Sequence, residues 1–140
     1  MFPDKELICS FPRIPDERGN LSFFENNRQI PFEIKRVYWI YDVPGGETRG
    51  GHAYKELEEV IVALSGSFDV VLHDGREEKR FTLNRSYYGL YVPKMIWRSL
   101  ENFSTNSLAF VAANAAYSEA DYIRDFHSFQ QMTQHATNGI

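Results

Sequence analysis

The stretch that decides the fold is Gly46-Glu47-Thr48-Arg49-Gly50-Gly51-His52-Ala53-Tyr54-Lys55-Glu56-Leu57-Glu58-Glu59-Val60-Ile61-Val62-Ala63-Leu64-Ser65-Gly66. It begins with glycines, alternates in the middle as a strand does, and ends in another glycine. His52, Tyr54 and Glu58 are separated by even numbers of positions, so an unbroken strand would place all three on one face of a sheet. Three reactive side chains on one face, next to a basic loop, indicate a functional site.

The segments on either side of this stretch are short strand-like runs separated by turns. We expect strands at 7–14, 21–25, 35–42, 67–73, 79–83, 87–93, 96–101 and 107–113. Asp74-Gly75 is a hairpin signal. About nine or ten short strands, with turns about every 8–12 residues, predict a sandwich, a jelly roll or a barrel. We expect this to be a single domain over residues 1–140.

Helix is expected only near the end of the chain. Ser118 is the predicted N-cap, because Asp121 follows it at nearly the capping-box spacing. Residues 119–132 are expected to form one helix or two short ones. Tyr122, Ile123, Phe126 and Phe129 would share one apolar stripe of that segment. Residues 133–140 are expected to be a frayed tail.

The composition narrows the class of protein. The chain has 140 residues, of which 43% are hydrophobic, so it can bury a core. A net charge of -4 argues against a nucleic-acid partner. A single cysteine, Cys9, excludes an intrachain disulfide and favours the reducing cytoplasm. No apolar run approaches the roughly 18 residues of a membrane span, so no membrane partner is expected.

The quoted stretch resembles the first sequence motif of the cupins. That motif reads Gly, five residues, His-x-His, three or four residues, Glu, six residues, Gly. Here Gly46 is followed by five residues, His52-Ala53-Tyr54, three residues, Glu58, seven residues and Gly66. The resemblance implies an all-β cupin jelly-roll barrel, here with extra N-terminal strands and a short C-terminal helical segment.

The second cupin motif is present in a degenerate form. It normally carries Pro-x-Gly, then a histidine and an asparagine. Here the corresponding positions hold Gly89, Pro93, Met95, Arg98 and Asn102, with a shortened first spacer. The two motifs lie in the cupin order, about one hairpin apart.

A metal is not expected in this cupin-like site. Metal cupins bind their ion through the two histidines and the glutamate of the first motif and the histidine of the second. Here Tyr54 and Arg98 replace two of these, leaving His52 and Glu58. Arginine has no lone pair to donate, and catalytic metals usually have about three protein ligands. We therefore expect neither a metal nor another cofactor.

A narrower resemblance, over roughly residues 5–130, is to the nucleotide-sugar 3,4-ketoisomerases of the FdtA and QdtA type, which are related to WxcM-like proteins. The segments that carry it are Asp16-Glu17-Arg18-Gly19, Arg49-Gly50-Gly51-His52-Ala53-Tyr54-Lys55, Gly89-Leu90-Tyr91-Val92-Pro93 and Asp121-Tyr122-Ile123-Arg124. The resemblance implies metal-independent conversion of dTDP-4-keto-6-deoxyglucose to its 3-keto isomer, which supplies dideoxyaminosugars for surface glycans such as lipopolysaccharide. It also implies a homodimer with exchanged N-terminal strands.

The residue types suit this chemistry. Moving a ketone from C4 to C3 requires proton removal from C3, an enediolate, and proton delivery to C4. The imidazole of His52 is suited to both transfers near neutral pH. Tyr54 and Arg98 could supply a donor and a positive charge to the enediolate. We predict His52 and Tyr54 as catalytic residues, with Arg98 binding the substrate.

The remaining substrate contacts are predicted from residue type and context. A diphosphate is best bound by arginines. Arg18 and Arg49, each in a glycine-containing turn, are the leading candidates, and Arg124 is a weaker one. Tyr38 and Trp97 could flank the thymine or the sugar.

Two departures from the family pattern leave alternatives open. Tyr54 stands where the family has its second histidine, so the protein could be an enzyme with one histidine, a noncatalytic nucleotide-sugar-binding cupin, or a cupin sugar epimerase. At position 98 FdtA-type members carry histidine and QdtA-type members arginine, whereas QdtA-type members carry tyrosine at the position of Arg18. Arg18 with Arg98 mixes the two patterns, and the configuration of the product at C4 stays open.

Overall fold

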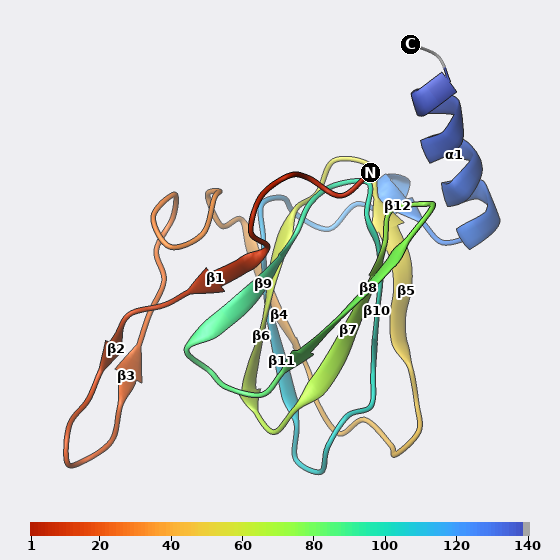
Figure 1. Cartoon of the computed structure of the whole chain (residues 1–140). Helices are drawn as coiled ribbons and strands as arrows, with labels where there is room; N and C mark the ends of the chain where they lie inside the picture. Colours follow the sequence, from red (N-terminus) through yellow and green to blue (C-terminus); the bar gives the residue numbers. More distant parts are fainter. Residues whose placement is uncertain (139–140) are drawn as a thin grey trace.

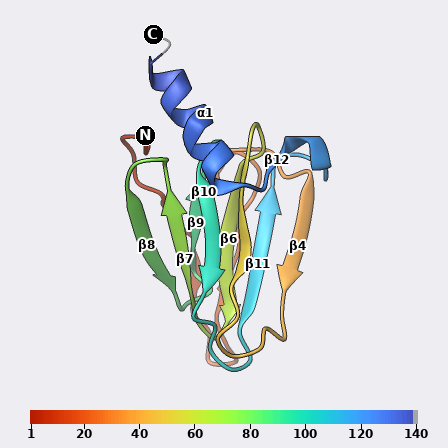
Figure 2. The same cartoon turned by 90° about the vertical axis from the view of Figure 1, so that its right-hand side faces the viewer.

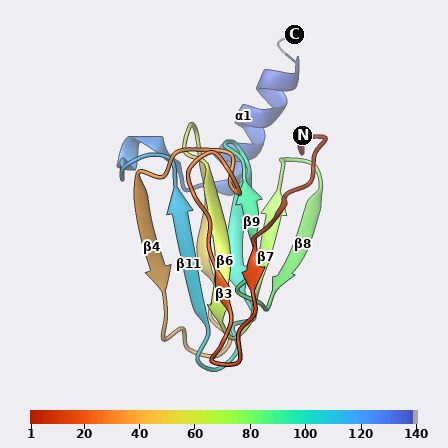
Figure 3. The same ribbon diagram turned by 90° about the vertical axis from the view of Figure 1, so that its left-hand side faces the viewer.

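Two antiparallel five-stranded sheets face each other in the computed structural model, which describes residues 1–138 (Figure 1). The first sheet has the order β1 (Ile8–Ser10), β9 (Tyr88–Val92), β6 (Glu59–Ser65), β11 (Leu108–Ala113), β4 (Arg36–Ile40) (Figure 3). The second has the order β12 (Tyr122–Ile123), β5 (Arg49–Tyr54), β10 (Trp97–Glu101), β7 (Phe68–His73), β8 (Glu78–Leu83) (Figure 2). The predicted all-β jelly roll with a short C-terminal helix is confirmed.

The extra N-terminal strands form a separate hairpin. β2 (Arg13–Ile14) pairs with β3 (Leu21–Ser22), and the hairpin projects away from the barrel (Figure 1). The expected strand over 7–14 is broken between β1 and β2 because Pro12 has no backbone N–H for a ladder. Phe11, just before it, is buried in the core at 6% exposure. The break lets the hairpin leave the first sheet.

The space between the two sheets is filled by apolar side chains. Ile61, Leu72, Leu90, Leu100 and Val111 are completely buried there and come from five different strands. Among the residues whose burial the structure describes, two charged side chains are buried as deeply as this core. They are Glu59 on β6 and Arg98 on β10, at 0% and 1% exposure.

The quoted stretch forms two strands, β5 and β6, instead of one. The break at 55–58 is made by Asp121, whose carboxylate accepts hydrogen bonds from the amides of Glu56 and Leu57 at 2.9 and 3.0 Å. Glu58 therefore does not share a face with the end of β5, and that prediction is wrong. Its carboxylate instead accepts hydrogen bonds from Tyr91 and Asn114.

The predicted helix over 119–132 is wrong in its bounds. Residues Glu119–Asp121 form a short 3-10 turn, Tyr122–Ile123 pair with β5 as β12, and the helix α1 runs over Phe126–Asn138. Ser118 makes no capping bond through its side chain; Asp125 caps α1 by accepting from the Ser128 amide at 2.9 Å. The expected tail is thus helical up to 138, and residues 139–140 lie outside the described residues.

The helix α1 covers the outer face of the second sheet at one end of the barrel (Figure 2). Phe129 is completely buried there, against Ala53 and Ile123, with Trp97 and Phe126 packed around them. Trp97 therefore lies under the helix, on the opposite side of β10 from Arg98. In the described part of the chain, no helix combines the length and the apolar character needed to cross a membrane.

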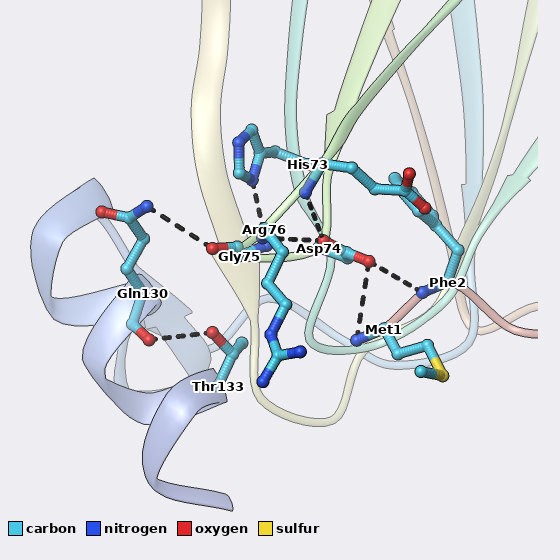
Figure 4. Close-up of polar contacts among 9 residues, drawn as sticks. Met1, Phe2, His73, Asp74, Gly75, Arg76, Gln130 and Thr133 are labelled. Carbon is cyan, nitrogen blue, oxygen red and sulfur yellow. Dashed lines mark hydrogen bonds and ion pairs between the residues drawn. The ribbon is translucent and has the colours of Figure 1, made fainter. Parts of the chain in front are cut away.

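The β7–β8 turn connects both ends of the described chain to the barrel (Figure 4). The Asp74 carboxylate accepts a hydrogen bond from the Phe2 amide at 3.1 Å and lies 3.8 Å from the Met1 amino group. The Gln130 amide of α1 donates to the Gly75 carbonyl at 3.4 Å. These contacts help to hold α1 against the sheet that carries the site.

Candidate active site

A pocket of about 400 Å³ opens between β4, at the edge of the first sheet, and β5 with β12, at the edge of the second. Six of the eight side chains that the sequence indicated for the site line it. They are Tyr38, Arg49, His52, Tyr54, Arg98 and Arg124. Arg18 and Trp97 do not line it.

Strand register brings His52 and Arg98 together. His52 on β5 lies directly opposite Arg98 on β10 in the antiparallel ladder. Directly opposed residues project from the same face of a sheet, so both side chains point into the barrel. Tyr54, two positions after His52, shares that face, whereas Ala53 and Trp97 point to α1. This alternation explains why Arg98 and not Trp97 is in the pocket.

His52, Tyr54 and Tyr122 form a compact group. The His52 Nε2 and the Tyr54 hydroxyl oxygen are 3.0 Å apart, and the Tyr54 hydroxyl donates to the Tyr122 hydroxyl at 3.4 Å. The three ring centroids lie 4.8–4.9 Å from one another. Because a hydroxyl has one proton, a Tyr54 that donates to Tyr122 accepts from Nε2–H of His52, which leaves Nδ1 as the unprotonated nitrogen.

The environment of His52 favours the neutral imidazole. Burial, followed by the charges of Arg98 and Arg124, lowers the pKa of His52 to about 3. Burial also raises the pKa of Tyr54 well above its usual value, so this tyrosine stays a neutral phenol. At neutral pH the site therefore holds an unprotonated base next to a phenol that can donate and accept.

Arg98 is held by two partners deep in the barrel. Its Nε lies 2.7 Å from Oε1 of Glu59, an ion pair without the alignment of a good hydrogen bond. Its Nη2 donates to the Tyr38 hydroxyl at 2.7 Å, and that hydroxyl donates to Oε2 of Glu59 at 2.9 Å. Although burial opposes the charge, Glu59 and the nearby tyrosines raise the pKa of Arg98, so its guanidinium stays charged.

Glu59 is a residue that the motif comparison missed. With a three-residue spacer, the glutamate of the motif falls on Glu58 and seven residues remain before Gly66. The four-residue spacer places the glutamate at 59 and leaves six residues before Gly66, which matches the first-motif spacing on both sides of the glutamate. The distance to Gly66 was therefore a signal in the sequence that could have identified the buried glutamate.

Gly50 lies where the backbone passes closest to Arg98. Its φ of +72° is in the left-handed region, and a Cβ at this position would lie 2.2 Å from Nη1 of Arg98. The same Nη1 makes a long contact of 3.4 Å with the Gly50 carbonyl. Glycine is the residue that satisfies both the backbone and the space here.

Three arginines stand around the pocket. Arg49 lies at the start of β5, and Arg124 packs over the Tyr122 ring at 4.1 Å while pairing with Glu119 at 2.7 Å. Arg36, which the sequence analysis did not single out, packs 4.8 Å from the Tyr38 ring centroid, and its buried Nη1 has no hydrogen-bond partner in the described structure. Because arginines stand on the β4 side and on the β5–β12 side of the pocket, the pocket suits an anionic ligand.

Arg18 lies away from this pocket. It is in the turn of the β2–β3 hairpin, where Nε and Nη2 donate to the Asp16 carboxylate at 2.9 and 2.8 Å. Its side chain is 89% exposed. Within one chain, therefore, the structure does not bring Arg18 together with the predicted residues that line the pocket.

The donor set of the pocket offers little to a metal ion. Within residues 1–138, no three side chains of His, Cys, Asp or Glu gather in a way that could hold one. Of the cupin ligand positions, His52 and Glu59 keep metal-binding types, and the Glu59 carboxylate is already paired with a guanidinium.

Comparison with known proteins gives consistent matches over nearly the whole chain. The family model FdtA, described as WxcM-like, C-terminal, matches residues 4–134. A TDP-4-oxo-6-deoxy-alpha-D-glucose-3,4-oxoisomerase from Aneurinibacillus thermoaerophilus is 44% identical over 124 residues, which is 89% of each protein.

Solved structures agree with these sequence matches. A 3,4-ketoisomerase from Helicobacter canadensis is 45% identical, with a TM-score of 0.88 over 91% of this chain and 96% of that one. QdtA, a 3,4-ketoisomerase from Thermoanaerobacterium thermosaccharolyticum, was solved as a histidine-to-asparagine variant in complex with TDP-4-keto-6-deoxyglucose. It is 35% identical, with a TM-score of 0.89 over 91% and 92% of the two chains.

Proposed function

Because the chain belongs to the FdtA family, described as WxcM-like, C-terminal, we propose that it is a metal-independent nucleotide-sugar 3,4-ketoisomerase. Its substrate is a TDP-4-keto-6-deoxyhexose, as in the relatives named above. The observation that carries the proposal is a buried, neutral His52 opposite a buried, charged Arg98 in a pocket rimmed by arginines.

The chemistry needs only proton movements. His52 takes the proton from C3, the electron pair forms a C3=C4 double bond, and the C4 carbonyl oxygen becomes an anion beside Arg98. The proton of the C3 hydroxyl then passes to the C4 oxygen, the imidazolium of His52 delivers a proton to C4, and the C3 oxygen becomes the new ketone. Reactant and product are isomers, so no external oxidant or reductant is required.

Tyr54 takes the place of a second histidine by fixing the tautomer of the first. Its hydroxyl accepts from Nε2–H of His52, and Nδ1 is the basic nitrogen. As His52 becomes an imidazolium, the same phenol oxygen stabilises the Nε2–H. A tyrosine next to a single histidine is thus compatible with turnover and does not require a purely binding role.

Binding of the substrate is expected to raise the pKa of His52. A pKa of about 3 makes His52 a weak base in the empty pocket, because burial and the charges of Arg98 and Arg124 disfavour the imidazolium. A bound diphosphate brings negative charge to this pocket and offsets the charges of the arginines, so the pKa of His52 rises towards its ordinary value.

Arg36, Arg49 and Arg124 are the proposed diphosphate ligands, and Tyr38 lies deeper in the pocket than these arginines.

We place Arg18 in the pocket of a second copy. The β2–β3 hairpin projects from its own barrel, and Ile14, Leu21 and Phe23 on or beside it are exposed at 51%, 55% and 37%. Burying these side chains against a second barrel is favourable, and exchange of the hairpins would carry Arg18 to the partner's pocket. A homodimer with exchanged N-terminal strands is therefore proposed.

The proposed compartment of the protein is the cytoplasm, in keeping with the single free Cys9.

Incubation with TDP-4-keto-6-deoxyglucose in deuterated water tests the function. NMR should show the 3-keto isomer with label at C4, and its coupling pattern reports the C4 configuration. Tight binding of TDP without isomerisation or exchange would indicate a noncatalytic binding protein, and label at C5 would indicate an epimerase.

His52→Asn should lose turnover by at least about 10²-fold with little change in TDP affinity. A chelator should leave the rate unchanged, and loss of activity would contradict the metal-free mechanism.

A further inference from the structure

An unusual feature of this site is a buried carboxylate, Glu59, that does not line the pocket. Glu59 is completely buried, yet none of the three rim arginines is among its ion-pair partners. Its two oxygens go to the Nε of Arg98 and to the Tyr38 hydroxyl, at 2.7 and 2.9 Å. Tyr38 in turn accepts from Nη2 of Arg98, which closes a triangle of three side chains from β6, β10 and β4.

The triangle accounts for two of the three guanidinium nitrogens. Nε is held by Glu59 and Nη2 by Tyr38, whereas Nη1 has only the 3.4 Å contact with the Gly50 carbonyl. Gly50 lies beside both side chains, because a Cβ built there would be 2.2 Å from Nη1 of Arg98 and 3.7 Å from Cε1 of His52. Nη1 is thus the nitrogen that remains available to a ligand, and it lies next to Gly50.

Stability alone is a weak reason for this arrangement. A buried ion pair contributes little net stability, because desolvation of both charges offsets their attraction, and apolar replacements are often as stable. What the pair does supply is orientation. Ion-paired at Nε and hydrogen-bonded at Nη2, the planar guanidinium is restrained, and a donor held in advance stabilises a developing anion better than one that must reorganise.

We propose that Glu59 is a positioning residue for the isomerisation, which aims Nη1 of Arg98 at the oxygen that becomes negative in the enediolate. This inference rests on the proposed function and adds to it the residue that orients the anion-stabilising donor. Glu59 touches no substrate; it acts through Arg98 and Tyr38. Because the oxygen at C4 gains its charge only after proton removal, the alignment affects kcat more than it affects KM or TDP affinity.

The neighbouring glutamate provides a matched control. Glu58→Gln makes the same chemical change one position earlier, at a carboxylate bonded to Tyr91 and Asn114 and outside the pocket. We expect Glu59→Gln to lower kcat by about 10²-fold, with KM and the Kd for TDP within about threefold of wild type. Glu58→Gln should keep kcat within about twofold of wild type. A folded Glu59→Gln with the kcat of Glu58→Gln would overturn the proposal.

Two further measurements cover other outcomes. If Glu59→Gln does not fold, Tyr38→Phe decides: it keeps the ion pair, removes the Nη2 anchor, and should lower kcat about tenfold without weakening TDP binding. An unchanged kcat in Tyr38→Phe would then overturn the proposal.

The orientation of Arg98 can also be read directly from the side-chain Nε–H NMR signal. This signal should be narrow and slow to exchange in wild type and in Glu58→Gln, and broadened in Glu59→Gln or Tyr38→Phe. A wild-type protein that binds TDP but does not isomerise the sugar would refute the proposed function. If the wild type is active and neither the Arg98 signal nor kcat changes in Glu59→Gln, only this inference is refuted.

Discussion

Replacing Gly50 by alanine tests the position of Arg98 without removing any chemical group from the site. Gly50 has a φ of +72°, and an added Cβ would lie 2.2 Å from Nη1 and 3.3 Å from Cζ of Arg98. The end of a flexible arginine could usually move aside. Arg98 is 1% exposed and held by Glu59 and Tyr38, so the guanidinium can move only by breaking those contacts.

The magnitude follows from two separable effects. An alanine in the left-handed region costs about 1–2 kcal/mol. Overpacking a tight site costs about 1–3 kcal/mol more. Gly46 provides the control, because its φ of +86° is also left-handed but a Cβ there meets nothing within 4 Å. Gly46→Ala should therefore show the first effect alone.

Thermal unfolding and turnover measure the difference. At about 4 °C per kcal/mol for a chain of this size, Gly50→Ala should melt about 4–12 °C below Gly46→Ala. Its kcat should fall about 10²-fold, since displacing an aligned catalytic group by about 1 Å has effects of that order. Gly46→Ala should keep nearly full activity. Equal melting temperatures and equal kcat values in the two variants would refute the reasoning that Arg98 is rigidly held and needed where it lies.

Two other predictions concern His52. Tyr54→Phe removes the short hydrogen bond at Nε2, so steady-state kinetics should show kcat reduced about 10–100-fold with TDP affinity maintained; full activity would exclude tautomer control by Tyr54. The lowered pKa of His52, about 3 in the folded state, also predicts a pH dependence of stability. The unfolded chain, with an ordinary histidine pKa near ~6.5, binds the extra proton first, so stability is present above that pH and is lost as the pH falls towards ~3. Denaturant titrations should show His52→Gln losing less stability across this window, by about 2 kcal/mol after allowance for solvent screening; parallel curves would contradict the assignment.

Much of the architecture follows from local pattern. Alternation of apolar and polar residues located most of the strands, because a period of two is a property of the backbone and needs no knowledge of the partner strand. Prolines and glycines located the turns for the same reason. The bounds of the C-terminal helix could not be found in this way. Asp121, which looked like part of a capping box, is used instead to bind the amides of Glu56 and Leu57, 65 and 64 positions away.

The sequence by itself identified His52 and Tyr54 as neighbours on one face of a strand. His52 and Tyr54 are two positions apart on one strand, so their shared face is a local fact, and the second motif selected Arg98 as the residue that faces them. The match of both motifs to one family also indicated the reaction. Each of these inferences depends on spacing within a segment, which the linear chain preserves.

Only the tertiary structure decided which residues complete the site. Because the strand breaks at 55–58, the glutamate that contacts Arg98 is Glu59 and not the predicted Glu58. Arg36 on β4 and Tyr122 on β12 line the pocket although the sequence did not indicate them. Arg18 and Trp97 lie outside it, Arg18 on the projecting hairpin and Trp97 beneath α1. The pocket lies between the edges of two sheets whose order is set by hydrogen bonds between distant strands. Local periodicity contains no information about which strands become neighbours, and that is why the supporting residues appear only once the barrel is formed.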